Sequence, residues 1–343
     1  MIVNIENGAD LSKIQSELAG LGCWVGPVHI SASGHRALLL KPYSAPVSAE
    51  DVRNIPGVES VLVAVSEHAR MDSQMLPLTV AGVDFGTGTP VVMAGPCSVE
   101  SEDQIYQAAR RVAGCGAQFL RGGAYKPRTS PYSFQGHGAP GLRWLQGAAT
   151  AFGLRTVTEL LTPEQADLVA CYADLIQIGS RNMQNMSLLR AAGQTGKPVL
   201  LKRGAAATLQ EWLLAGEAAL LAGAQTVLLC ERGVRGFDPT TRNLLDLGTV
   251  AHLASLGLGI IVDPSHATGR RDLVLPLAQA GLAAGACGLL VETHDQPQTA
   301  LSDGPQALTP HQFAQLMGSL ALFGNRTRQS RSVDTEVAWG GVQ

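Results

Sequence analysis

The stretch VLLKRGAAATLQEWLLAGEAALLAGAQTVLLCERG, residues 199–233, decides the fold class. Its two short runs, Val199–Lys202 and Val227–Cys230, are aliphatic on consecutive positions, as strands covered on both faces require. Between them, residues 211–223 have the apolar spacing of a helix, with glycine-containing segments on either side. This order predicts a β–α unit of a parallel sheet.

The same unit repeats outward in both directions from Pro90 onward. Eight such runs that alternate with helical segments predict an α/β fold, a closed (β/α)8 TIM barrel over residues 89–324. A doubly wound open sheet is the competing architecture, but no GxGxxG motif follows the first run. The eight runs are Val91–Ala94, Gln118–Arg121, Arg155–Thr158, Leu175–Ile178, Val199–Lys202, Val227–Cys230, Ile260–Val262 and Leu289–Val291.

The segments outside the barrel have other patterns. Residues 1–66 read as strand, helix, strand, strand, helix, strand, which predicts a small ferredoxin-like α+β domain. Residues 67–88 are mixed in polarity without a sustained period, so we expect a linker and the entry to the barrel. Residues 325–343 are polar without an apolar period, and we expect them to be disordered.

Composition excludes several functional classes. The 343 residues are 45% hydrophobic and 15% charged with a net charge of −3, so no global basic field is present to hold nucleic acid or an anionic membrane. The N-terminus lacks the regions of a signal peptide, and no uncharged apolar run is long enough to span a bilayer. The six cysteines are scattered without CxxC spacing. We therefore expect a cytoplasmic protein with free thiols.

Every one of the eight runs ends in a reactive or charged side chain. In a barrel the strand C-termini share one rim, where the chemistry of this fold is found. A single arginine after a strand is more often a solvated loop charge, but eight such endings together favour a site. They are Cys97, Arg121, Glu159, Arg181, Lys202, Arg232, His266 and Glu292.

Four of the rim residues suggest a metal. Cys97, His266 and Glu292 are joined by Asp303 in the loop after the last run. A thiolate, an imidazole and two carboxylates suit one borderline divalent ion, Mn, Fe, Co or Zn, rather than a hard Ca or Mg cage. Each residue alone also fits a structural role: Cys97 as a small buried hydrophobe, and Asp303 as a turn residue before Gly304.

The cations form a second set. Seven positive side chains around one mouth predict a substrate, or two, that carries phosphate and carboxylate groups. The loop 126–136 adds hydroxyls and backbone donors, which suggests a second phosphate site beside Arg128. The set is Arg121, Lys126, Arg128, Arg181, Lys202, Arg203 and Arg232.

These motifs resemble a known family, 3-deoxy-D-arabino-heptulosonate 7-phosphate (DAHP) synthase. The similarity is to its short type I form (I-beta), which is shared with KDO-8-phosphate synthases and can carry an N-terminal ferredoxin-like domain. The resemblance spans about residues 88 to 320. It rests on GPCS (95–98), RGGAYKPRTSPYSFQG (121–136), QIGSRNMQN (177–185), LLKRG (200–204), DPSHATG (263–269) and LSDGP (301–305).

The resemblance implies an activity and site roles. Phosphoenolpyruvate and erythrose 4-phosphate would condense to DAHP and phosphate, the entry step of the shikimate pathway to chorismate and the aromatic amino acids. The implied metal ligands are Cys97, His266, Glu292 and Asp303. The implied phosphoenolpyruvate cradle is Arg121, Lys126, Arg181, Lys202 and Arg232, and the implied aldose-phosphate contacts are Arg128, Thr129 and Ser130.

Further expectations concern catalysis, regulation and assembly. Lys126 is the expected proton donor, and Glu159 is a second candidate that would orient the water or Lys126, although simple neutralisation of a cation explains it equally well. The resemblance also implies a regulatory role for residues 1–66, with feedback inhibition by Tyr or Phe, and a homo-tetramer. Residues 285–296 depart from the family pattern at Cys287 and after Glu292, which puts rate or metal preference in question.

Three alternative functions stay open. KDO-8-phosphate synthase uses arabinose 5-phosphate, but it reads Lys-Ala-Asn-Arg-Ser-Ser where this chain has KPRTS (126–130), a stiffer loop that shortens the pocket. A non-catalytic ligand-sensing barrel that regulates a partner enzyme would not need four intact ligands. A metal-dependent hydrolase would want several histidines, and only His266 stands among the ligands.

Overall fold

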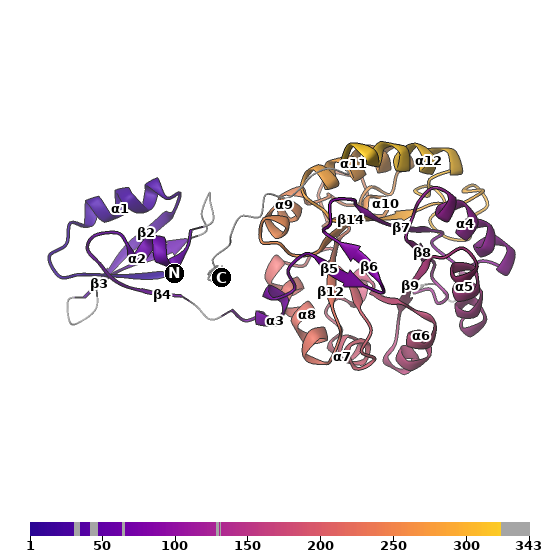
Figure 1. Ribbon diagram of the computed structural model, residues 1–343, viewed down its shortest axis with the longest axis horizontal. Helices are drawn as coiled ribbons and strands as arrows, with labels where there is room; N and C mark the ends of the chain where they lie inside the picture. Colours follow the sequence, from indigo (N-terminus) through magenta and orange to yellow (C-terminus); the bar gives the residue numbers. More distant parts are fainter. Residues whose placement is uncertain (31–34, 42–46, 64–65, 128–129, 131, 324–343) are drawn as a thin grey trace. The chain divides into compact units, whose positions relative to one another are not determined.

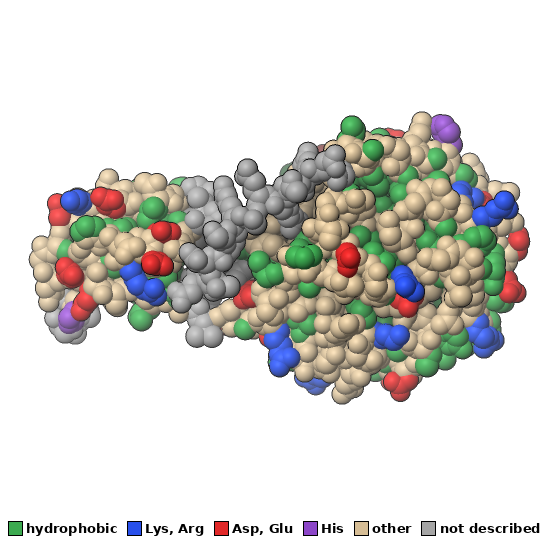
Figure 2. Space-filling view, in the orientation of Figure 1, with side chains coloured by type: hydrophobic (Ala, Val, Ile, Leu, Met, Phe, Trp, Pro, Cys, Tyr) green, Lys and Arg blue, Asp and Glu red, His purple; other side chains and the backbone are tan. Residues whose placement is uncertain are grey.

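The structure is a computed structural model that describes residues 1–30, 35–41, 47–63, 66–127, 130 and 132–323. The described residues form two compact units, one over Met1–Glu67 and one that begins at His68 (Figure 1). Acidic and basic side chains are interspersed on the face of each unit shown in Figure 2. Among the described helices, none has the length and apolarity needed to cross a membrane.

The first unit is an antiparallel sheet with two helices on one face. Its strand order is β2 (Trp24–Ile30), β3 (Arg36–Lys41), β1 (Ile2–Ile5) and β4 (Val58–Leu62). This is the arrangement of a ferredoxin-like sandwich, so the predicted fold class of this part is confirmed. The inner side chains of the strands alternate with outer ones and meet Ile14, Leu18 and Val52 of the helices. The elements are β1 Ile2–Ile5, α1 Leu11–Gly20, β2 Trp24–Ile30, β3 Arg36–Lys41, α2 Ala49–Arg53 and β4 Val58–Leu62.

The second unit is a closed barrel of eight parallel strands, which confirms the predicted TIM barrel. The strands are buried along almost their whole length, because side chains of the barrel interior cover one face and the helices cover the other. The strands are β7 Val91–Gly95, β8 Phe119–Arg121, β9 Arg155–Leu160, β10 Leu175–Ile178, β11 Val199–Lys202, β12 Val227–Glu231, β13 Ile260–Val262 and β14 Gly288–Glu292.

Helices surround the barrel, and side chains cap the N-termini of several of them. Thr208 and Glu211 form a capping box at the start of α8, and Ser101 accepts a backbone hydrogen bond at the start of α4. The helices are α4 Glu102–Gly114, α5 Ala139–Ala151, α6 Ala166–Tyr172, α7 Met186–Gln194, α8 Leu209–Leu221, α9 Leu247–Ser255, α10 Pro264–Thr268, α11 Arg271–Ala283 and α12 Pro310–Ser319. Three 3-10 turns are η1 Pro163–Gln165, η2 Ser180–Asn182 and η3 Leu320–Phe323.

Residues 67–88 differ from the expected linker. They form helix α3 (Ala69–Asp72) and a hairpin of β5 (Leu78–Val80) and β6 (Val83–Phe85), which lies across one end of the barrel (Figure 1). Val80 and Phe85 are fully buried in one cluster with the first residues of the barrel strands. Strands of three residues are too short to show a period in the sequence, so this element could not be recognised there.

Candidate active site

The turn after β7 brings Cys97 to the opposite end of the barrel from the hairpin. A Cβ atom at Gly95 would lie 2.1 Å from the carbonyl oxygen of Arg121 on β8, so only glycine permits the two strand ends to approach this closely. The chain then turns through Pro96, and Cys97 is buried. The sequence Gly95-Pro96-Cys97 therefore turns the chain so that the Cys97 thiol lies inside the rim.

The four predicted metal ligands come together at this rim. Ligand atoms of Cys97, Glu292 and Asp303 all lie within 4.8 Å of one another, and the Cys97 Sγ is 3.1 Å from Asp303 Oδ2. The His266 Nε2 lies 3.3 Å from Glu292 Oε1 and 3.9 Å from Asp303 Oδ2. The turn after β7, the helix α10, the end of β14 and the loop that follows it supply these atoms, which form a donor set that can hold a divalent ion.

Burial controls the ionisation of the thiol. It raises the pKa of Cys97 to about 12, and the charge of Glu292 adds to this effect. The Lys126 Nζ is 2.9 Å from the Cys97 Sγ and 2.8 Å from the Cys97 carbonyl oxygen, so it stands directly beside the ligand cluster. Without a metal the cysteine is therefore a thiol, and a bound cation would replace its proton.

Asp263, which sequence reasoning missed, orients His266. It is fully buried, its Oδ2 lies 2.7 Å from His266 Nδ1, and its Oδ1 accepts a hydrogen bond from the His266 backbone at the start of α10. An Nδ1–H that donates to Asp263 leaves Nε2 free as a ligand atom. The signal was the Asp in DPSH, which resembles an ordinary helix cap.

Asp263 also binds a predicted substrate cation. The Lys202 Nζ donates to Asp263 Oδ2 at 2.6 Å. Burial alone would raise the pKa of Asp263, but the charges of His266 and Lys202 outweigh it and hold that pKa well below its ordinary value. The carboxylate is therefore charged, and it links the ligand set to the cation set.

Both oxygens of Glu292 are fixed by neighbours. Arg121 NH1 donates to Oε1 at 2.8 Å, and Gln306 Nε2 donates to Oε2 at 2.6 Å. Burial would lower the pKa of Arg121, but the charge of Glu292 raises it above its ordinary value. Gln306 was also missed, because a glutamine in a loop carries no charge signal.

Two adjacent strand-end cations have different surroundings. Arg203 NH1 pairs with Glu231 and Asp246 at 2.9 Å each, and its guanidinium lies 5.7 Å from the ring centre of Trp212. These contacts place Arg203 in an internal ion network and do not support the predicted substrate contact. The reason is geometric: consecutive strand residues point to opposite sides, so Lys202 faces the barrel interior and Arg203 faces the helices.

Arg232 is different again. It is buried, with 8% of its surface exposed, and among the described residues no carboxylate pairs with it. Burial lowers the pKa of its guanidinium, although the charge of Asp263 opposes this. A buried cation without a protein partner is the arrangement expected for a group that meets an anionic ligand.

The remaining predicted residues lie around this centre or outside the description. Arg181 is exposed and donates to the Pro127 carbonyl oxygen at 3.4 Å, near the start of the loop 126–136. Ser130 is described, whereas Arg128 and Thr129 lie outside the described residues. Glu159 pairs with Gln177 in the register of β9 and β10, and among the described residues no hydrogen bond joins it to Lys126.

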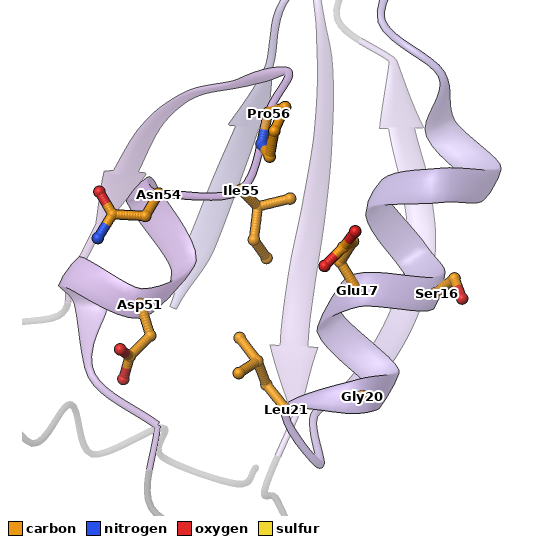
Figure 3. A pocket seen from close by; sticks show the side chains of 8 residues that line it. All are labelled: Ser16, Glu17, Gly20, Leu21, Asp51, Asn54, Ile55 and Pro56. Atoms are coloured by element: carbon orange, nitrogen blue, oxygen red, sulfur yellow. The ribbon is translucent and has the colours of Figure 1, made fainter.

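A separate hollow of about 420 Å³ lies in the first unit, between α1 and α2 (Figure 3). Glu17 of α1 and Asp51 of α2 give it two carboxylates, and its described lining includes no lysine or arginine. Its lining suits an amino group better than a carboxylate. The lining residues are Ser16, Glu17, Gly20, Leu21, Asp51, Asn54, Ile55 and Pro56.

Comparison with known proteins places this arrangement in a family. The sequence profile of the DAHP synthetase I family matches residues 64–322. The phospho-2-dehydro-3-deoxyheptonate aldolase of Thermotoga maritima is 45% identical over 328 residues, which cover 92% of this chain and 96% of the relative. The 2-dehydro-3-deoxyphosphooctonate aldolase of Acidithiobacillus ferrooxidans is 31% identical over 67% of this chain and 88% of its own length.

Solved structures agree. The crystal structure of the Thermotoga maritima DAHP synthase superposes with a TM-score of 0.73 and 38% identity, covering 94% of this chain and 96% of that one. A truncated form of the Thermotoga maritima synthase gives a TM-score of 0.67 and 43% identity over 73% of this chain and 92% of its own. The chain therefore belongs to the DAHP synthetase I family and carries its activity, that of a phospho-2-dehydro-3-deoxyheptonate aldolase (DAHP synthase).

Proposed function

We propose that the rim condenses phosphoenolpyruvate with D-erythrose 4-phosphate to give DAHP and phosphate, and that the residues predicted from the sequence have the roles given below. The observation that carries these roles is the pairing of an anion site with a ligand set. Arg232 is buried, pairs with no carboxylate among the described residues, and follows β12 at the same end of the parallel barrel as the ligand cluster around Cys97. A doubly anionic substrate and an electrophilic centre need those two features side by side.

A divalent metal fits the donor set. The Cys97 thiol, the His266 Nε2 and the carboxylates of Glu292 and Asp303 would hold it, and their mixture of soft and hard atoms suits Mn, Fe, Co or Zn. When bound, such an ion supplies Lewis-acid polarisation of a carbonyl oxygen. The neighbours Asp263, Arg121 and Gln306 fix the orientation of His266 and Glu292.

The cations bind and orient the first substrate. Arg232, Lys202 and the free nitrogens of Arg121 would bind the carboxylate and phosphate of phosphoenolpyruvate, with Arg181 at the outer edge. Holding two mutually repelling anions in contact is a positioning task, and fixed guanidinium groups perform it at low cost in reorganisation. Arg203 is not included in this cradle, because its donors are engaged with Glu231 and Asp246.

The second substrate would enter over the loop 126–136, with its phosphate at Arg128, Thr129 and Ser130. Lys126 then lies between the loop and Cys97, where its Nζ can donate a proton to the aldehyde oxygen. The C3 carbon of phosphoenolpyruvate forms the new bond to the aldehyde carbon. Water adds at C2, and the phosphate leaves with cleavage of its C–O bond. Glu159 is the proposed residue for orienting that water.

The test is consumption of phosphoenolpyruvate by the purified protein with Mn²⁺, with and without EDTA. Erythrose 4-phosphate and arabinose 5-phosphate are offered in parallel, since relatives of both specificities align with this chain. We expect consumption with erythrose 4-phosphate that EDTA abolishes. Consumption with arabinose 5-phosphate alone would reject the proposed aldose, and undiminished consumption in EDTA would reject the metal.

Regulation and assembly form a further part of the proposal. We expect Tyr or Phe at millimolar concentration to inhibit the enzyme through the first unit, whose hollow offers carboxylates to an amino group. Unchanged rates with both amino acids would reject this effector. The proposed homo-tetramer is tested by sedimentation velocity, and the cytoplasmic location by fractionation of the source cells.

A further inference from the structure

The loop that carries Asp303 is held in place from the β7 side. Asp303 has φ of 52°, a left-handed conformation that L residues rarely adopt. Such a conformation persists only where surrounding contacts determine it. Two residues before it, the Leu301 backbone N–H donates to Glu100 Oε1 at 2.8 Å, and the neighbouring Ser302 hydroxyl accepts from Ser98 at 2.6 Å.

The other oxygen of Glu100 faces the segment after Glu292. The Glu100 Oε2 lies 3.4 Å from the His294 Nε2, and the His294 side chain is only 8% exposed. The His294 Nδ1 accepts a hydrogen bond from the backbone N–H of Gln296 at 3.1 Å. The His294 Nε2 is buried and makes no hydrogen bond to any described residue, so Glu100 is the carboxylate that lies beside it.

We propose that Glu100 is a positioning residue of the metal centre, whose carboxylate fixes the relative positions of three ligands, Cys97, Glu292 and Asp303. It lies three residues after Cys97 on the same turn, holds the Asp303 loop through Leu301, and contacts the Glu292 segment through His294. It touches no ligand atom itself. This inference rests on the proposed metal site and assigns the residue that maintains its geometry.

An independent contact keeps the loop attached when Glu100 is changed. Arg271 of α11 donates from Nε to the Ala307 carbonyl oxygen at 2.5 Å and from NH2 to the Gly304 carbonyl oxygen at 2.7 Å. These bonds hold the far side of the loop. Loss of the Glu100 carboxylate therefore releases the near side and displaces Asp303 without detaching the whole segment.

The experiment compares Glu100→Ala, Glu100→Gln and the control Glu102→Ala in the full chain. Glu102 is an exposed carboxylate two residues further along, at the start of α4. The readouts are the Kd for Mn²⁺, the visible spectrum of the Co²⁺-loaded protein, kcat and KM. Removing an outer partner of a metal site typically costs 10–100-fold in affinity or activity.

We expect Glu100→Ala to raise the Kd about tenfold or more, to change the Co²⁺ spectrum and to lower kcat, with little change in the KM for phosphoenolpyruvate. Glu100→Gln should restore most of the affinity, because its amide oxygen can still accept from Leu301. Glu102→Ala should match the wild type. If Glu100→Ala does not fold, Glu100→Asp, which keeps the charge but shortens the reach by one methylene, takes its place.

Two results would overturn the inference. One is a Glu100→Ala protein whose Kd and Co²⁺ spectrum equal those of the wild type. The other is an equal loss in Glu102→Ala, which would reveal a general effect of charge. A wild-type protein that binds neither Mn²⁺ nor Co²⁺ would instead reject the metal site itself, and the role of Glu100 with it.

Discussion

The two ends of the barrel contain side chains of opposite character. At the end covered by the hairpin, Phe85 and Val80 pack against buried apolar side chains of the barrel strands, and Cys287 belongs to the same cluster. At the other end, Cys97 and its neighbours form a buried network of charges and a thiol. The same strands therefore contribute stability at one end and chemistry at the other, as this fold allows.

The largest expected effect comes from replacing one cysteine at each end of the barrel by alanine and comparing the two variants. Cys97→Ala removes a proposed ligand, so metal content should fall and kcat/KM should drop by more than about 100-fold, since loss of even an outer partner costs up to that amount. Cys287→Ala removes a buried thiol at the hairpin end and should leave metal content unchanged. Metal analysis and steady-state kinetics check both. Full metal content in Cys97→Ala would disprove the ligand assignment.

A substitution at the hairpin end should lower the stability and leave the activity of the folded protein almost unchanged. Phe85 is fully buried, and its ring centre lies 6.1 Å from that of Phe119. Phe85→Ala leaves a cavity, so we expect a loss of about 3–5 kcal/mol in the free energy of unfolding. Chemical denaturation measures this loss, and Val83→Ala on the same strand should cost less because Val83 is only partly buried. The activity per folded molecule should stay near the wild-type value.

The third prediction distinguishes the cations within the rim. Arg232→Ala removes the buried unpaired guanidinium and should lower kcat/KM for phosphoenolpyruvate about 10–100-fold, the value of one or two charged hydrogen bonds. Arg235→Ala, three residues further along and exposed, is the matched control. If both variants lose activity equally, the loss comes from the overall electrostatic potential and not from a specific contact between Arg232 and an anion.

The smallest effect concerns pH at the start of the second unit. His68 is buried with its Nδ1 2.9 Å from Asp72 Oδ1. Burial alone would lower the pKa of His68, but the hydrogen bond and charge of Asp72 outweigh it and raise that pKa. Its stabilising contribution is therefore complete below the ordinary value of about 6.5 and is lost as pH rises through the raised pKa.

This linkage can be measured with two variants. The Tm difference between the wild type and His68→Gln should be larger at pH 5.5 than at pH 8.5. Asp72→Asn should show the same trend, because it removes the partner that raises the pKa. A Tm difference that is independent of pH in both variants would contradict the assigned charge state.

The sequence predicted these two ends unequally. The strands were recognisable because runs such as Val199–Lys202 are aliphatic on consecutive positions, and the rim followed from where each run ends. The hairpin was missed because only two of its six strand residues, Val80 and Phe85, are fully buried. A local hydrophobic pattern therefore predicts long elements well and strands of three residues poorly.

The candidate site was predictable as a set of residue types but not as a set of contacts. Lys202 and Arg203 are adjacent cations in the sequence, and only the direction of each side chain separates a residue of the barrel interior from one in an ion network. Asp263 and Gln306 were missed because their function lies in bonds to His266 and Glu292, which are close in space. Such supporting residues leave little trace in a single sequence.

The hairpin of β5 and β6, which covers one end of the barrel, has an evolutionary consequence. Its residues belong to the unit that begins at His68, and all the described side chains of its buried cluster come from that unit. A lineage could lose, gain or exchange the N-terminal unit by recombination upstream of this point, and the catalytic unit would not aggregate through an uncovered core. The chemistry of the barrel and the proposed effector site of the first unit could thus change independently of one another.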